Sequence, residues 1–276
     1  MGPFSFNAFR FMLGALILLP WIGWRHKTED QKSRTKPKTQ SSTPALMIGA
    51  LIAGALIFLG AGFQQVGIQY TTIGNTGFIT GLYIIFVPVL SLFLGHRYPH
   101  GIWFAVILAC VGLYLLSGMD GVTIAYGDLL VLVGAIFWAF HVIVIDHMTD
   151  RHDQIKFAAL QFMVCSLLSY GAALYVGDKA FLFTFDEWKW VIISGVLAVG
   201  FGYTLQVIGQ TTSPPTQAAV IMSLEAVFAA IFGYFYFDEI LSNRALLGCI
   251  LMFTGCLLTQ LFPPLPNPKL ASQSID

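Results

Sequence analysis

The stretch Thr216–Glu239 reads TQAAVIMSLEAVFAAIFGYFYFDE, and it decides the fold class. As a helix, its apolar part Thr216–Phe237 is long enough to cross the roughly 30 Å hydrocarbon core of a bilayer. One carboxylate, Glu225, lies near the middle, where a charge costs about 2.5–3.5 kcal/mol on insertion scales. Gln217 lies on the same helix face as Glu225. Two interpretations stay open: Glu225 belongs to a substrate or proton site, or it is a buried acid that fixes helix packing.

The composition indicates an integral membrane protein. The chain has 276 residues, of which 57% are hydrophobic and 10% charged, and its mean hydropathy is +0.76. Soluble domains carry about 25% charged residues. The four cysteines lie in apolar runs and form no CxxC pair, which favours small core residues over metal ligands or disulfides. We therefore expect the lipid bilayer as a partner, and neither a cofactor, a metal nor a nucleic acid.

Hydrophobic segments of membrane-spanning length recur along the whole chain, and they predict an all-α polytopic membrane helical bundle with nine visible spans. These segments are Phe4–Trp24, Ala45–Val66, Ile73–Leu94, Gly101–Gly118, Leu129–Ile145, Phe157–Val176, Trp188–Ile208, Thr216–Phe237 and Ala245–Phe262.

The distribution of basic residues predicts the orientation in an inner (plasma) membrane. The longest connection, Arg25–Pro44, is rich in lysine and arginine, which is typical of a cytoplasmic loop. Alternation from this loop places ten basic residues on the cytoplasmic side and three on the outside, and it predicts a cytoplasmic tail, residues 263–276.

An internal repeat divides the chain into two homologous halves, residues 1–118 and 127–262. Three pairs of segments match in order: SFNAFRFM with KFAALQFM, GFQQVGIQYTT with GYTLQVIGQTT, and LACVGLYLL with LMFTGCLLT, beginning at Ser5 and Lys156, Gly62 and Gly202, and Leu108 and Leu251. The second half has five spans and the first has four. We expect that the first half lacks its opening helix, and that five-span halves insert with opposite topology as an inverted repeat.

The sequence resembles the EamA-type transporters of the drug/metabolite transporter (DMT) superfamily. The resemblance covers essentially the whole chain, and its most specific parts are TTIGNTGFITGLYIIFVPVL (Thr71–Leu90) and SLEAVFAAIFGYFYFDEILSNRALLGCILMFTGCLL (Ser223–Leu258). The sequence differs from the usual family pattern at two places. It has Ala226 where the family usually has proline, and it lacks the glutamate that the family usually has near His96.

The resemblance implies a ten-span inverted repeat that exports small metabolites, such as amino acids or related compounds, by alternating access. The small-molecule substrate would lie midway between the halves, and Glu225 makes protons a candidate coupling ion. Polar side chains within the spans are the candidate substrate-binding residues: Glu225, Gln217, Thr80, Tyr83, Gln65, Trp138, His141, Tyr203 and Gln206. For Thr80 and Tyr83 hydrogen bonding between helices is an open alternative, and for His141 it is packing.

Two other classes of function were weighed against a carrier. His141 and Asp146 have the H-x4-D spacing of some acyltransferases, which would make the chain an integral membrane enzyme. The sequence has no HExxH or GxSxG motif, and we expect no enzymatic activity. A channel is the other alternative, but channels commonly repeat polar filters across an oligomer, whereas an inverted repeat within one chain favours a carrier.

Overall fold

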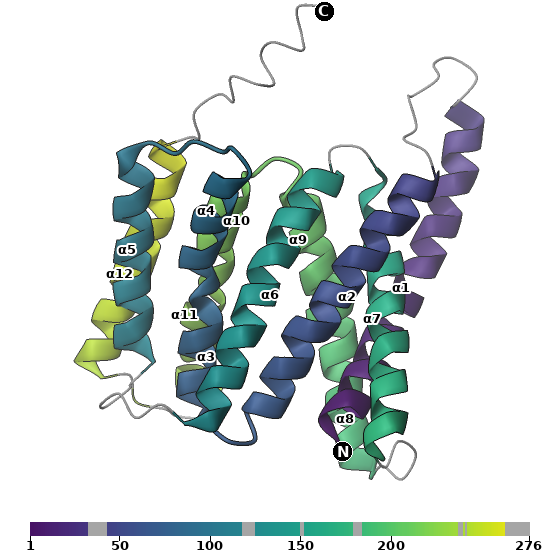
Figure 1. Ribbon diagram of the computed structural model, residues 1–276, viewed down its shortest axis with the longest axis horizontal. Coiled ribbons are helices and arrows are strands. Elements are labelled where there is room, and N and C mark those ends of the chain that lie inside the picture. The colour runs from purple at the N-terminus through teal and green to yellow at the C-terminus, as the bar shows by residue number, and fades with distance from the viewer. Residues whose placement is uncertain are drawn as a thin grey trace, which may run out of the picture. The chain divides into compact units, whose positions relative to one another are not determined.

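The regular elements of this protein are helices throughout the part that the structure describes. The computed structural model describes residues 1–32, 43–117, 125–149, 152–178, 184–236, 240 and 242–262, with the backbone alone for 25–32 and 236 (Figure 1). Residues 33–42 of the basic connection expected in the cytoplasm, and all of the tail 263–276, lie outside these residues.

The helices follow one another along the chain with short connections. They are α1 (Pro3–Lys32), α2 (Thr43–Gly67), α3 (Ile73–Gly81), α4 (Tyr83–Phe93), α5 (His100–Leu116), α6 (Tyr126–Thr149), α7 (Gln154–Val176), α8 (Phe185–Ile193), the π-helix η1 (Ser194–Tyr203), α9 (Thr204–Gly209), α10 (Pro215–Ser223), α11 (Glu225–Tyr236) and α12 (Asn243–Leu261).

These helices confirm the expected polytopic membrane bundle. In the described part of the chain, 8 helical stretches are long and apolar enough to cross a membrane, and α5 is a shorter apolar helix. Three of these stretches consist of consecutive elements: α3 with α4, α8 to α9, and α10 with α11. Each expected segment therefore coincides with a helix or with a helix that is interrupted within the span.

The chain forms two compact units, and each unit takes helices from both halves of the sequence. Unit 1 comprises residues 1–65 and 144–212, and unit 2 comprises residues 66–143 and 213–276. In unit 1, α1 packs on α7, and in unit 2, α5 packs on α12 and α4 on α10. The first two pairs contain segments that match in the internal repeat, so helices from equivalent positions in the two halves lie together.

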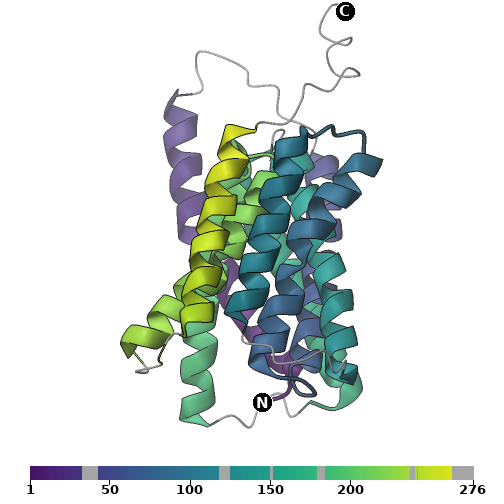
Figure 2. The ribbon, with the colours of Figure 1, turned by 90° about the vertical axis from the view of Figure 1, so that its left-hand side faces the viewer.

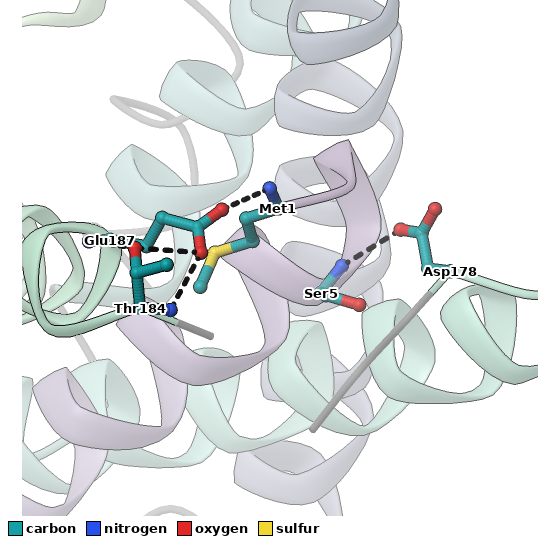
Figure 3. A network of polar contacts seen from close by, with 5 residues as sticks. All are labelled: Met1, Ser5, Asp178, Thr184 and Glu187. Carbon is teal, nitrogen blue, oxygen red and sulfur yellow. Dashed lines mark hydrogen bonds and ion pairs between the residues drawn. The ribbon is translucent and has the colours of Figure 1, made fainter. Parts of the chain in front are cut away.

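Unit 1 holds α1 firmly at its beginning and along its length. The Asp178 carboxylate accepts hydrogen bonds of 3.2 Å from the backbone N–H groups of Phe4 and Ser5, which no helical carbonyl can satisfy. Figure 3 shows the bond from Ser5. The Met1 amino group pairs with Glu187 in the same network. Further along, Ser166 of α7 donates a 2.7 Å hydrogen bond to the Ala8 carbonyl.

Unit 2 contains a close glycine-mediated crossing of α5 and α12, which run side by side in both ribbon views (Figure 2). A Cβ atom at Gly112 would lie 2.7 Å from the Gly248 carbonyl oxygen, and one at Gly248 would lie 2.6 Å from the Gly112 oxygen. At Gly255 it would lie 2.8 Å from the Ala105 oxygen. Small residues let membrane helices approach this closely, which maximises dispersion contacts where no hydrophobic effect drives association.

Candidate functional site

Two interrupted helices in unit 2 form the centre of the candidate site. The span Ile73–Phe93 breaks at Leu82, between α3 and α4, and the span Pro215–Phe235 breaks at Leu224, between α10 and α11. Both leucines have φ −61° and ψ −11°. The Leu82 N–H bonds the Ile79 carbonyl at 3.2 Å, and the Leu224 N–H bonds the Ile221 carbonyl at 3.1 Å. Each break is therefore a tightened turn with the same geometry in both halves.

The residues before the two breaks explain why the helices are interrupted there. Gly81 precedes Leu82, and glycine costs about 1 kcal/mol relative to alanine within a helix. Ser223 precedes Leu224, and its hydroxyl donates a 2.7 Å hydrogen bond to the Val220 carbonyl, which competes with the helical pattern. Proline usually kinks a helix, but Pro88 lies inside α4, several residues beyond the break.

Polar side chains gather around the two breaks. Tyr83 is the first residue of α4, and Glu225 is the first residue of α11. Thr80 lies just before Gly81, and the side chains of Thr80 and Tyr83 are buried, whereas that of Glu225 is exposed. Because α4 packs on α10, the two interrupted spans meet within one unit. Interrupted helices are tolerated at membrane depth where they lie in protein or line a polar cavity.

Gln217 contacts a neighbouring helix rather than the breaks. Its amide donates a buried 2.8 Å hydrogen bond to the Thr259 carbonyl of α12. That carbonyl belongs to the last turn of the helix, and the residue four positions further is Pro263, which has no N–H to offer. Gln217 thus satisfies an acceptor that the sequence leaves without a backbone donor.

Trp138 and His141 lie in the part of α6 that belongs to unit 2. Their rings make a T-shaped contact with 5.7 Å between centroids, and His141 has no exposed surface. This burial and the ring contact favour packing over a proton relay for His141.

The other candidate residues belong to unit 1. Gln65 and Tyr203 are half-buried, and the Tyr203 ring stacks on Phe11 with 5.9 Å between centroids. The Gln206 amide donates a 3.3 Å hydrogen bond to Gln210. The structure thus brings Glu225, Thr80 and Tyr83 to the helix breaks and distributes the remaining candidates over both units.

Asp128 is a structural residue that the sequence alone did not single out. Its carboxylate accepts hydrogen bonds from the Thr71 hydroxyl, the Asn75 amide at 3.4 Å and the Ala125 backbone N–H at 2.8 Å. It ties the beginning of α3 to the beginning of α6. Thr71 and Asn75 belong to the TTIGNTGF motif, so these motif residues hold the interrupted span in place.

Metal-binding and acyltransferase sites each need particular side chains close together. Within the described residues no cluster of three or more His, Cys, Asp or Glu side chains could hold a metal ion. His141 and Asp146 are both on α6, five residues apart.

Comparison with known proteins gives the family. The profile of the EamA-like transporter family matches residues 1–118 and 125–261. An uncharacterized transporter of Archaeoglobus fulgidus is 32% identical over 95% of this chain and 78% of its own length. The threonine/homoserine exporter RhtA of Escherichia coli is 24% identical over 90% of this chain and 78% of its own length.

A solved crystal structure has the same fold, with a TM-score of 0.75 over 95% of this chain and 88% of that one, at 17% identity. Together these findings define a multi-pass membrane protein with a transporter fold. The chain belongs to the EamA-like transporter family, within the DMT superfamily. Its partners are accordingly the lipid bilayer and a small-molecule substrate.

Proposed function

We propose that this protein is a secondary transporter of the plasma membrane that exports small metabolites, such as amino acids or related compounds, by alternating access. The observation that carries this proposal is the pair of interrupted helices at equivalent positions of the two halves. In inverted-repeat transporters such breaks mark the substrate and ion site. The resemblance to RhtA supports amino acids as the first substrates to test. The halves, residues 1–118 and 127–262, would be the two inverted repeats.

Glu225 would couple transport to proton entry. It begins α11 directly after the break at Leu224, within the span Pro215–Phe235. A pH gradient of one unit can drive at most about tenfold accumulation for each coupled proton, since one unit corresponds to 1.36 kcal/mol. Thr80 and Tyr83, which lie at the other break in the same unit, would contact the substrate.

Reconstituted vesicles test this function. The purified protein should exchange labelled L-threonine or L-homoserine against an internal pool of the same compound, which a carrier does and an enzyme does not. A channel would instead let the label equilibrate without a burst of exchange. Failure to exchange any compound in a broad amino-acid panel would contradict the proposed substrate class.

The coupling role has its own test. Glu225→Gln keeps the side-chain shape and removes titration, so it should abolish accumulation driven by an imposed pH gradient while exchange continues. Asp186→Asn is the matched control, because Asp186 is an exposed carboxylate in the first turn of α8. Both rates are normalised to the amount of folded protein. If Glu225→Gln accumulated substrate in response to the pH gradient as the wild type does, Glu225 would have no role in coupling.

A further inference from the structure

Arg10 is a buried cation inside the first membrane span. It lies on α1 within unit 1, and 9% of its surface is exposed. Asn7, one turn earlier on the same helix face, has no exposed surface. Charged side chains at this depth are costly, and they persist where they pair with another group or serve a substrate pathway.

The described residues provide no counter-charge for Arg10. No carboxylate lies within ion-pairing distance of it there, and its buried Nε has no hydrogen-bond partner. The ionisable side chains that interact with it are Tyr203 and Cys165, which are ordinarily uncharged at neutral pH. Both polar atoms of the Asn7 amide also lack a partner in the described part of the chain. Leaving such buried groups unpaired costs several kcal/mol, so an occupant that satisfies them would gain affinity.

Two aromatic rings lie close to the Arg10 guanidinium. Its Cζ lies 5.1 Å from the ring centroids of both Phe6 and Phe11. Aromatic faces stabilise a guanidinium through its positive charge, but they accept none of the N–H bonds that point outward in its plane. That planar fork matches a carboxylate with two parallel hydrogen bonds.

Packing alone does not require a cation at this position. The repeat sets Ser5–Met12 beside Lys156–Met163, and the residue equivalent to Arg10 is Gln161 of α7, which is fully buried. A neutral amide therefore fills the same position in the other half. The π-helix η1 also packs on this turn of α1, since a Cβ at Gly195 would lie 2.9 Å from the Arg10 carbonyl oxygen. π-helical segments often occur at functional sites.

We propose that Arg10 and Asn7 bind the carboxylate of the transported solute, Arg10 through two parallel hydrogen bonds and Asn7 through its amide. This inference rests on the proposed transport function and deepens it, because it assigns the solute to the carboxylate-bearing class. Amides and esters of the same compounds would then be poor substrates.

The test measures binding to the purified full-length protein, independently of transport. Calorimetric titration with L-threonine and with L-threoninamide should show binding of the acid at least about tenfold tighter. Arg10→Met should weaken threonine binding about 100-fold, Arg10→Lys should weaken it less, and Asn7→Ala about tenfold, as expected for a charged pair with one supporting hydrogen bond. The matched control is Arg244→Met, because Arg244 lies over the Tyr114 ring at 5.3 Å in unit 2. Its threonine affinity should equal that of the wild type.

A second measurement separates a ligand role from a structural one. Arg10→Met should raise the unfolding temperature of the ligand-free protein, because it removes a buried charge that has no partner. A structural arginine would give the opposite sign. The proposal is overturned if Arg10→Met unfolds at a lower temperature or binds threonine as the wild type does. It is equally overturned if the wild type binds none of threonine, homoserine and acetate, or binds acid and amide alike. Carboxylate binding without any transport would support this proposal and contradict the proposed function.

Discussion

Gln217 shows how a polar residue inside a membrane span can be structural although it shares a helix face with Glu225. Its hydrogen bond joins α10 to the Thr259 carbonyl, 42 residues away in the sequence. Gln217→Ala should lower the free energy of unfolding by about 1–3 kcal/mol, because it leaves a buried carbonyl unsatisfied. Thermal unfolding of the purified protein followed by fluorescence measures the loss.

Gln69→Ala is the control for this change, since Gln69 is exposed after the end of α2 and the same truncation there should alter stability by less than about 0.5 kcal/mol. If Gln217→Ala unfolded like the wild type and instead lost affinity for the transported solute, Gln217 would belong to the binding site.

Sequence reasoning located the polar residues of the spans but not their contacts. Glu225 and Thr80 stand out because polar side chains are rare in apolar runs. The partner of Gln217 depends on which helices pack together, and no spacing along the chain encodes that. Arg10 was visible in the sequence as well, but its burial emerges only when α1 packs on α7 and η1, where the described residues offer it no counter-charge.

At the scale of the elements, the positions of the helices were predictable and their interruptions were not. Length and hydropathy are sufficient to place a span, because the bilayer sets both. Pro88 suggested a kink, yet α4 continues through it and the break occurs at Leu82. Gly81 and Ser223 do not by themselves mark a break in the sequence, since glycine and serine also occur within the other spans; in the structure α4 and α10, which adjoin the two breaks, pack on each other.

The close crossing of α5 and α12 at Gly112 and Gly248 should not tolerate a larger residue. Gly248→Ala would bring a Cβ within 2.6 Å of the Gly112 oxygen and 2.7 Å of the Leu116 nitrogen, both backbone atoms that cannot move without displacing a helix. We expect a loss of about 1–3 kcal/mol in the free energy of unfolding, as overpacking usually costs. Thermal unfolding in detergent measures it.

Gly77→Ala is the matched control, because no atom lies within 4 Å of a Cβ placed at Gly77, which is exposed on α3. It should leave stability unchanged or raise it by up to about 1 kcal/mol through helix propensity. Equal unfolding temperatures for the Gly248 and Gly77 variants would mean that the crossing does not hold the two helices together.

On the scale of the whole molecule, the compact units differ from the halves of the sequence. The repeat indicated two equivalent halves, which suggests that each half folds by itself. In the structure each unit instead combines the two halves, with α1 on α7 in one and α5 on α12 in the other. This exchange was not predictable from matched segments, because similarity between halves says nothing about which half a helix packs on.

Because helices of one half of the sequence pack on helices of the other half, we predict that neither half is stable alone. Residues 1–118 and 125–276 expressed as separate chains should each be degraded, because α1 would lose α7 and α5 would lose α12. Expressed together, they should assemble, co-purify through a tag on one half, and unfold in one transition. Gly248→Ala in the second half should reduce the co-purified amount, whereas Gly77→Ala in the first should not. A half that accumulates alone and unfolds cooperatively would show that the pairing of equivalent helices is dispensable for folding.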